Sequence, residues 1–254
     1  MNLSSHEKAL KKNVFFTENK WPHFNLLFKD INKISKKIKV NSTVVSLERT
    51  KLYGGVSLFA PYFERNKFIS VDCTSNKLKK RGSYNDKFVT NKNIVKMNSS
   101  LTCNYRDIKL KSNSADWILI PNLMHHIDDG KVLLKQSHKI LKSRGSLYIF
   151  EPLLRELHQV PEDYGRYTPF LLEKLLKEIG FKKFSYKFTG GPFSSIAYMW
   201  DQAIQYFPLK KRNEFEMWFK KEFKRLIKLE KKYKINLVRK NTISPVAFSI
   251  IAKK

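Results

Sequence analysis

The sequence predicts an α/β fold with a mostly parallel β-sheet and helices on both of its faces. Two continuous apolar runs, 115–120 and 146–150, flank a segment whose apolar residues recur at helical spacing. Such runs are typical of strands buried on both faces, and a helix between them is typical of a parallel crossover. Two shorter runs, 43–48 and 67–72, precede this unit. The chain of 254 residues, 42% of them hydrophobic, is long enough to bury a sizeable core.

The N-terminal half is predicted to contain one helix and three strands before this central unit. Apolar residues at helical spacing indicate a modest helix over 25–38. The strands are predicted at 43–48, 67–72 and 94–97.

The first two of these strands end in acidic residues. Glu48 and Asp72 stand 24 positions apart, close to the spacing of one β-α-β unit. An acid at the end of the second strand can accept hydrogen bonds from both hydroxyls of a ribose, although the same residue could instead cap a helix.

Polar side chains also follow the two apolar runs of the central unit. Asn122, His125 and His126 come after the first run, and Glu151 closes the second. In open sheets, ligands bind outside the carboxyl ends of the strands. We therefore expect these residues at or near a functional site.

The C-terminal part is predicted to add a helix, a strand, a long helical insert and a closing strand. Thr168 is a suitable N-cap, Pro169 suits the first helical position, and Gly180 ends the helix. The later elements are expected at 184–188 (strand), 195–237 (helical insert) and 244–252 (strand).

The central unit also resembles a known family. Asp-x-Ile, His-His-Ile-Asp-Asp and then Leu-Lys-x-x-His-Lys-Ile-Leu-Lys-x-x-Gly-x-Leu-x-Ile-x-Glu-Pro are similar to strands four and five of class I S-adenosylmethionine (SAM) dependent methyltransferases. The segment from Pro161 to Thr168 resembles the Pro-x-Asp-x-x-Arg-Tyr-Thr of a type 11-like branch, several members of which act on sugars or glycans. The resemblance covers residues 40–190. It implies a Rossmann-like sheet with an antiparallel last strand and a helical insert before that strand.

This resemblance implies a set of residues that bind SAM or its product, S-adenosylhomocysteine. The family has a Gly-x-Gly-x-Gly turn after strand one, but Thr50 and Leu52 stand at the first two glycine positions. Either a longer loop carries a glycine pair to the cofactor, or the site has weakened. The expected cofactor-binding residues are Glu48 toward the amino group, Asp72 toward the ribose, Asn98 toward the adenine, and Gly54, Gly55, Ser99 and Asn122.

The candidate catalytic residues are three histidines and one acid. Methyl transfer from a sulfonium needs a positioned acceptor and, for a hydroxyl, a base, and the ordinary pKa of histidine suits that task. The candidates are His125, His126, His158 and Asp163, although each histidine could equally be a buried structural residue. Their spacing does not suggest a zinc site, and no metal is expected.

The segment after His158 is polar and aromatic, which suits a hydroxyl-rich acceptor. We expect Tyr164, Arg166 and Tyr167 to bind the substrate, with Arg166 able to hold an anionic group. The alternative is a structured loop in which Arg166 and Tyr167 brace the sheet.

The net charge of +28 invites a nucleic-acid or membrane-surface interpretation. Lysines are spread along the whole chain, however, as a general compositional bias would produce, and both explanations stay open. Apolar runs long enough for a transmembrane helix are absent, the N-terminus lacks the apolar region of a signal peptide, and two cysteines form no disulfide framework. A cytoplasmic location is therefore expected.

These observations predict a SAM-dependent methyltransferase, with O-methylation of a sugar, glycan or other polar small molecule as the expected reaction. The alternatives are a degenerate, non-catalytic binding protein and an RNA-directed methyltransferase. The predicted division of the chain is an N-terminal helical cover (1–40), a SAM-binding domain (41–194), a helical insert or lid (195–240) and a closing strand (241–254).

Overall fold

The computed structural model describes residues 22–50, 57–73, 100–233, 238–239, 242–243 and 245–254. Its centre is a seven-stranded sheet in the order β3-β2-β1-β4-β5-β9-β6. The strands are β1 (Thr43–Glu48), β2 (Lys67–Asp72), β3 (Leu101–Thr102), β4 (Ala115–Pro121), β5 (Leu141–Pro152), β6 (Lys182–Thr189) and β9 (Ala247–Lys253).

The predicted fold class is confirmed. Strands β1 to β5 pair in parallel, whereas β9 runs antiparallel to both of its neighbours, β5 and β6. Chain order reverses between β1 and β4, and this switch point is where open α/β sheets bind their ligands. The strand predicted at 94–97 lies outside the described residues.

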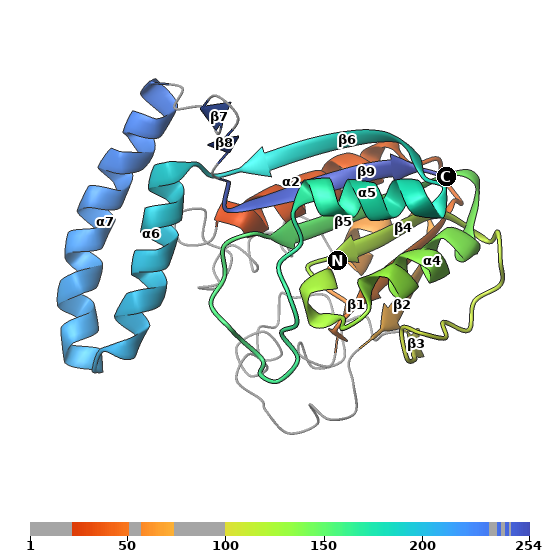
Figure 1. The fold of residues 1–254 in the computed structure, drawn as a ribbon, viewed down its shortest axis with the longest axis horizontal. Coiled ribbons are helices and arrows are strands. Elements are labelled where there is room, and N and C mark those ends of the chain that lie inside the picture. Colours follow the sequence, from red (N-terminus) through yellow and green to blue (C-terminus); the bar gives the residue numbers. More distant parts are fainter. Residues whose placement is uncertain (1–21, 51–56, 74–99, 234–237, 240–241, 244) are drawn as a thin grey trace.

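Helices cover both faces of the sheet (Figure 1). Helix α2 (Pro22–Lys37) buries Leu27 and Ile31 in one core with Val44 and Tyr148. Helices α4 (Gly130–Ile140) and α5 (Pro169–Ile179) pack on the opposite face, around Val45, Leu47 and Ile118. Alternate residues of β1 therefore serve the two cores, as the two-residue period of a strand requires.

Helix α5 begins and ends as its sequence predicts. The Thr168 side chain accepts a hydrogen bond from the Leu171 N–H, and Pro169 occupies the first turn. Gly180 adopts φ 108°, and its N–H donates to the last carbonyls of the helix.

Strand β5 differs from its prediction. The apolar run at 146–150 predicted a strand that starts after Gly145, but the strand begins at Leu141 and continues through residues 143–145. The change in direction is absorbed within the strand, because Arg144 has φ 63° and the register with β4 shifts between Ala115 and Trp117. A β-bulge of this kind inserts extra residues without ending the ladder.

The chain between β6 and β9 forms two antiparallel helices that extend beyond the sheet (Figure 1). They are α6 (Pro192–Ala203) and α7 (Leu209–Lys232), and they are followed by a small hairpin of β7 (Val238–Arg239) and β8 (Thr242–Ile243). Glu230 of α7 accepts hydrogen bonds from the Ser194 N–H and Oγ at 3.0 and 2.7 Å, which joins the two helices. This is the helical insert predicted before the last strand.

Candidate active site at the strand ends

A pocket that is open to solvent lies at the carboxyl ends of β1 and β4. Its position at the switch point suits a small-molecule site. The lining residues come from α2, the end of β1 and the segments after it, the end of β4, and the loop after β5; they are Phe24, Leu27, Phe28, Glu48, Arg49, Leu58, Phe59, Pro121, Asn122, His126 and Gln159. Glu48, Asn122 and His126 were among the predicted site residues.

Glu48 is buried and surrounded by hydroxyl groups. Ser57 Oγ donates to Glu48 Oε1 at 2.7 Å, and Ser70 Oγ lies 3.4 Å from the same oxygen. Burial raises the pKa of Glu48 to about 7, against hydrogen bonds from the neighbouring serines that lower it. Glu48 is therefore a carboxyl group that can exchange a proton near neutral pH.

Asp72 stands directly beside Glu48 at the end of the next strand. The two residues are register partners in β1 and β2, and only 1% of Asp72 is exposed. Glu48 lines the pocket, and Asp72 stands beside it on the neighbouring strand, so the two carboxyl groups offer acceptors for the amino and hydroxyl groups of an adenosyl amino acid. Gly54, Gly55, Asn98 and Ser99 lie outside the described residues.

Arg49 was not predicted as a site residue. Its guanidinium donates to Glu162 Oε2 at 2.7 Å and to Gln159 Oε1 at 2.8 Å. Both partners belong to the loop after β5, so a buried ion pair joins this loop to the end of β1. The position of Arg49 directly after an apolar strand was the one sequence feature that indicated a role at the site. Its partner, 113 positions away, could not be predicted from the sequence.

The turn after β4 is held by Glu151. Glu151 Oε1 accepts hydrogen bonds from the N–H groups of Leu123 and Met124 at 2.9 and 2.7 Å. Glu151 Oε2 accepts from His125 N at 3.3 Å and contacts His125 Nδ1 at 2.6 Å. A single buried carboxylate thus fixes both the 3₁₀ turn Met124–His126 and the orientation of the His125 ring.

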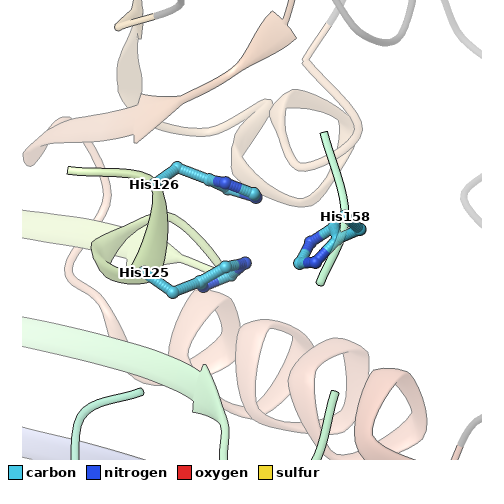
Figure 2. Close-up of side chains that lie close together, drawn as sticks. All are labelled: His125, His126 and His158. Atoms are coloured by element: carbon cyan, nitrogen blue, oxygen red, sulfur yellow. The ribbon is translucent and has the colours of Figure 1, made fainter. Parts of the chain in front are cut away.

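The three predicted histidines come together. Figure 2 shows the His125 and His126 rings, from the turn after β4, facing His158 from the loop after β5. One ring nitrogen from each histidine lies within 4.8 Å of those from the other two. The ring centroids of His125 and His126 are 3.9 Å apart, and those of His126 and His158 are 4.8 Å apart.

Two of these imidazoles are strongly biased toward the neutral form. Burial, followed by the charges of His125 and Arg49, lowers the pKa of His126 far below its ordinary value. Burial, followed by the Arg155 cation, lowers the pKa of His158 to about 3. At neutral pH both rings therefore carry a lone pair, although each is a weak base.

Asp163 and Arg166 are bound to each other. Arg166 donates to both carboxylate oxygens of Asp163 and to the carbonyl oxygens of Arg155 and Glu156. Burial opposes ionisation of Asp163, but hydrogen bonds from Arg166 and the His158 N–H outweigh it and lower the pKa of Asp163 to about 2. The geometry thus gives Arg166 the bracing role that was the alternative to substrate binding, and it gives Asp163 a positioning role toward His158.

The two predicted substrate tyrosines have different surroundings. Tyr164 is 53% exposed, and its N–H donates to the His125 carbonyl at 2.8 Å. Tyr167 is half-buried against the core, and its hydroxyl lies so close to Gly130 that a β-carbon there would be 2.3 Å away. Of the two, Tyr164 presents its side chain to solvent beside the histidines.

The described helices include none that is long and apolar enough to cross a membrane.

Comparisons with known proteins agree with this geometry. A family described as "Methyltransferase domain" matches residues 54–149. Among solved structures, a SAM-dependent methyltransferase from Archaeoglobus fulgidus is similar with a TM-score of 0.52 and 16% identity, over 94% of this chain and 99% of that one. Phosphoethanolamine N-methyltransferase 2 of Haemonchus contortus, in complex with SAM, is similar with a TM-score of 0.53 and 13% identity. That match covers 99% of this chain, which spans only 56% of the nematode protein.

No curated protein sequence matches the chain. The sheet order with its antiparallel β9, the pocket at the switch point and the matched domain lead to one assignment. The chain has the fold of the class I SAM-dependent methyltransferases, and over residues 54–149 it is similar to a family described as a methyltransferase domain.

Proposed function

We propose that this methyltransferase transfers the methyl group of SAM to an oxygen atom of a polar acceptor such as a sugar, a glycan or a similar small molecule. The observation that carries the proposal is the polar part of the pocket wall. His126 and Gln159 line the pocket, and the ring centroids of His125 and His158 lie 3.9 and 4.8 Å from that of His126.

The histidines of this cluster suit a hydroxyl acceptor. Burial lowers the pKa values of His126 and His158, so at neutral pH their rings offer lone pairs to which a hydroxyl group can donate. The nematode relative is described as an N-methyltransferase, so acceptor chemistry is the point on which the two proteins would differ.

In this proposal the chain acts mainly by positioning. SAM supplies an activated methyl group, and Glu48 and Asp72 hold its amino and ribose groups. Neutral His126, which lines the pocket, accepts the hydrogen bond of the acceptor hydroxyl, and the proton released on methyl transfer leaves to solvent through the open pocket. The exposed Tyr164 ring contacts the acceptor from the loop side. Orientation of this kind can account for a large part of the rate of an in-line displacement.

The cofactor part of the proposal is tested by thermal unfolding with SAM and with S-adenosylhomocysteine. At about 100 times its dissociation constant, either ligand should add about 2.7 kcal/mol to the unfolding free energy. For a chain of this size that is a melting shift of about 5–10 °C. We expect the shift in the wild type, its loss in Asp72→Asn, and its retention in Asp107→Asn, which changes an exposed carboxylate.

The absence of a shift in the wild type would contradict the proposal and favour the degenerate binding protein. Acceptor class is tested by release of S-adenosylhomocysteine with three panels: neutral sugars and glycans, phosphoethanolamine and related amines, and RNA. Turnover with the first panel supports O-methylation. Turnover confined to the amines or to RNA would overturn it, and RNA turnover would assign a function to the net charge of +28.

A further inference from the structure

The ring nitrogens of the histidine cluster have a feature that methyl transfer alone does not explain. Each Nδ1 contacts an acceptor: Glu151 Oε2 for His125 at 2.6 Å, the Glu162 carbonyl for His126 at 2.5 Å, and the Glu156 carbonyl for His158 at 3.1 Å. A carbonyl oxygen only accepts hydrogen bonds, so Nδ1 carries the proton in His126 and His158. The Glu151 oxygens already accept from three backbone N–H groups, so His125 Nδ1 is the donor in its contact with Glu151 Oε2.

The Nε2 atoms are therefore the ring nitrogens that these contacts leave available. His125 Nε2 is fully buried and has no hydrogen-bond partner among the described residues. A buried polar atom without a partner costs about 1–3 kcal/mol. At neutral pH the Nε2 atoms of His126 and His158 carry lone pairs, so neither of them can donate a hydrogen bond to the other.

We propose that His125, His126 and His158 together bind one divalent transition-metal ion through Nε2, with a coordination position left open toward the cofactor pocket. Three neutral imidazole ligands are the set preferred by Zn²⁺, Co²⁺ and similar ions, and not by Mg²⁺ or Ca²⁺.

The distances allow such a site with small side-chain movements. Tetrahedral coordination at about 2.1 Å places ligand nitrogens about 3.4 Å apart. One ring nitrogen of each histidine lies within 4.8 Å of one from each of the others, so these separations would need to shorten by at most about 1.4 Å. His158 is on a loop, and rotation of its ring is the simplest way to close the site.

The groups behind the rings match the outer shell of known histidine metal sites. Ligating histidines commonly donate their other N–H to a carboxylate or a backbone carbonyl, which fixes the ring and raises its basicity. Glu151 and Asp163 place two negative charges in this outer shell. The nearby cations are themselves paired, Arg49 with Glu162 at 2.7 Å and Arg155 with Glu156 at 3.3 Å.

The open position is inferred from the lining of the pocket. His126 is shared between the cluster and the pocket wall, so an ion bound by the three rings would adjoin the space where an acceptor is held. A metal ion there would lower the pKa of a bound hydroxyl, which the weakly basic His158 cannot do alone. This last step rests on the proposed function, whereas metal binding itself does not.

The test is titration of the untagged, chelator-treated protein with Zn²⁺ by calorimetry and with Co²⁺ by visible absorption. We expect one equivalent per chain and the intense absorption of low-coordinate Co²⁺. His126→Gln and His158→Gln should each weaken binding by more than about 100-fold. His138→Gln, which removes a histidine of α4 beside Phe181, should leave affinity unchanged.

Absence of stoichiometric binding, or equal weakening in His138→Gln, would overturn the proposal. Circular dichroism verifies that each variant is folded. If one of the two cluster variants does not fold, the other is sufficient for the comparison. Azide added to the Co²⁺ protein should perturb the spectrum if a position is open, and an unchanged spectrum would refute that part. These titrations contain neither SAM nor an acceptor, so their failure would leave the melting shift with SAM untouched.

Discussion

Replacing Glu151 by alanine is expected to lower the free energy of unfolding by about 3–5 kcal/mol. The carboxylate is 0% exposed and accepts from three backbone N–H groups and from His125 Nδ1. Alanine would leave all four donors buried without a partner, in a turn too tightly enclosed for easy entry of water. Urea unfolding of the wild type and of Glu151→Ala measures the difference directly.

Glu178→Ala is the matched control, because it removes a glutamate whose ion pair with Lys131 is exposed. Little change is expected there. If the unfolding free energy of Glu151→Ala lies within about 1 kcal/mol of the wild-type value, other contacts hold the turn.

Glu151→Gln keeps the shape of the side chain and changes the His125 tautomer. The amide oxygen can still accept from Leu123 and Met124, but the amide NH₂ then faces His125 Nδ1. His125 Nδ1 must become the acceptor, and the proton moves to Nε2. Nitrogen-15 NMR of the imidazole should show this exchange of roles, together with about 10–100-fold weaker metal binding.

Replacing Glu48 by glutamine is expected to remove a pH dependence of stability worth roughly 3 kcal/mol. The folded-state pKa of Glu48 is raised from 4.5 to about 7, so the folded protein binds this proton more tightly than the unfolded chain does. The stabilisation is fully present below pH 4.5 and is lost as pH rises through 7. Glutamine resembles the protonated carboxyl group at every pH. The free energy of unfolding of the variant therefore rises relative to that of the wild type as the pH increases from 4.5 to about 7.

Urea unfolding of both proteins at intervals from pH 4.5 to 8 gives the difference curve. Glu64→Gln is the control, because it changes an exposed glutamate between β1 and β2. Its difference in unfolding free energy from the wild type should not vary with pH. A flat curve for Glu48→Gln as well would mean that Glu48 ionises without cost in the folded state. The Glu48→Gln variant should also show a smaller melting shift with SAM. The substitution would then stabilise the protein near neutral pH and weaken its binding of the cofactor.

The sheet could be predicted from sequence because its signals are local. The runs at 43–48 and 67–72 are bounded by polar residues, and both strands formed at those positions. Helix α5 carries its cap, its first-turn proline and its terminal glycine within a dozen residues. The start of β5 was missed because a bulge at Arg144 uses the same turn-forming residues as a true turn.

The arrangement of the site depends on the path of the loop after β5, which local patterns do not determine. His126 and His158 are 32 positions apart, and their spacing gave no indication of a shared ligand. Their approach results from contacts that tie this loop to β1 and to the turn after β4, namely Arg49 with Glu162 and the Tyr164 N–H with the His125 carbonyl. Such long-range pairs have no periodicity that a sequence could reveal.

The position of β9 also affects how the protein is made. This strand is the last in chain order, yet it lies between β5 and β6. During synthesis, β1 to β5 can pair as they emerge, but β6 has no neighbour until residues 247–253 exist. Translation of the intervening residues 190–246 takes about 3–11 s at typical rates. Throughout that interval the apolar edge of β5 is open on the nascent chain, where chaperones or a second unfinished chain can pair with it.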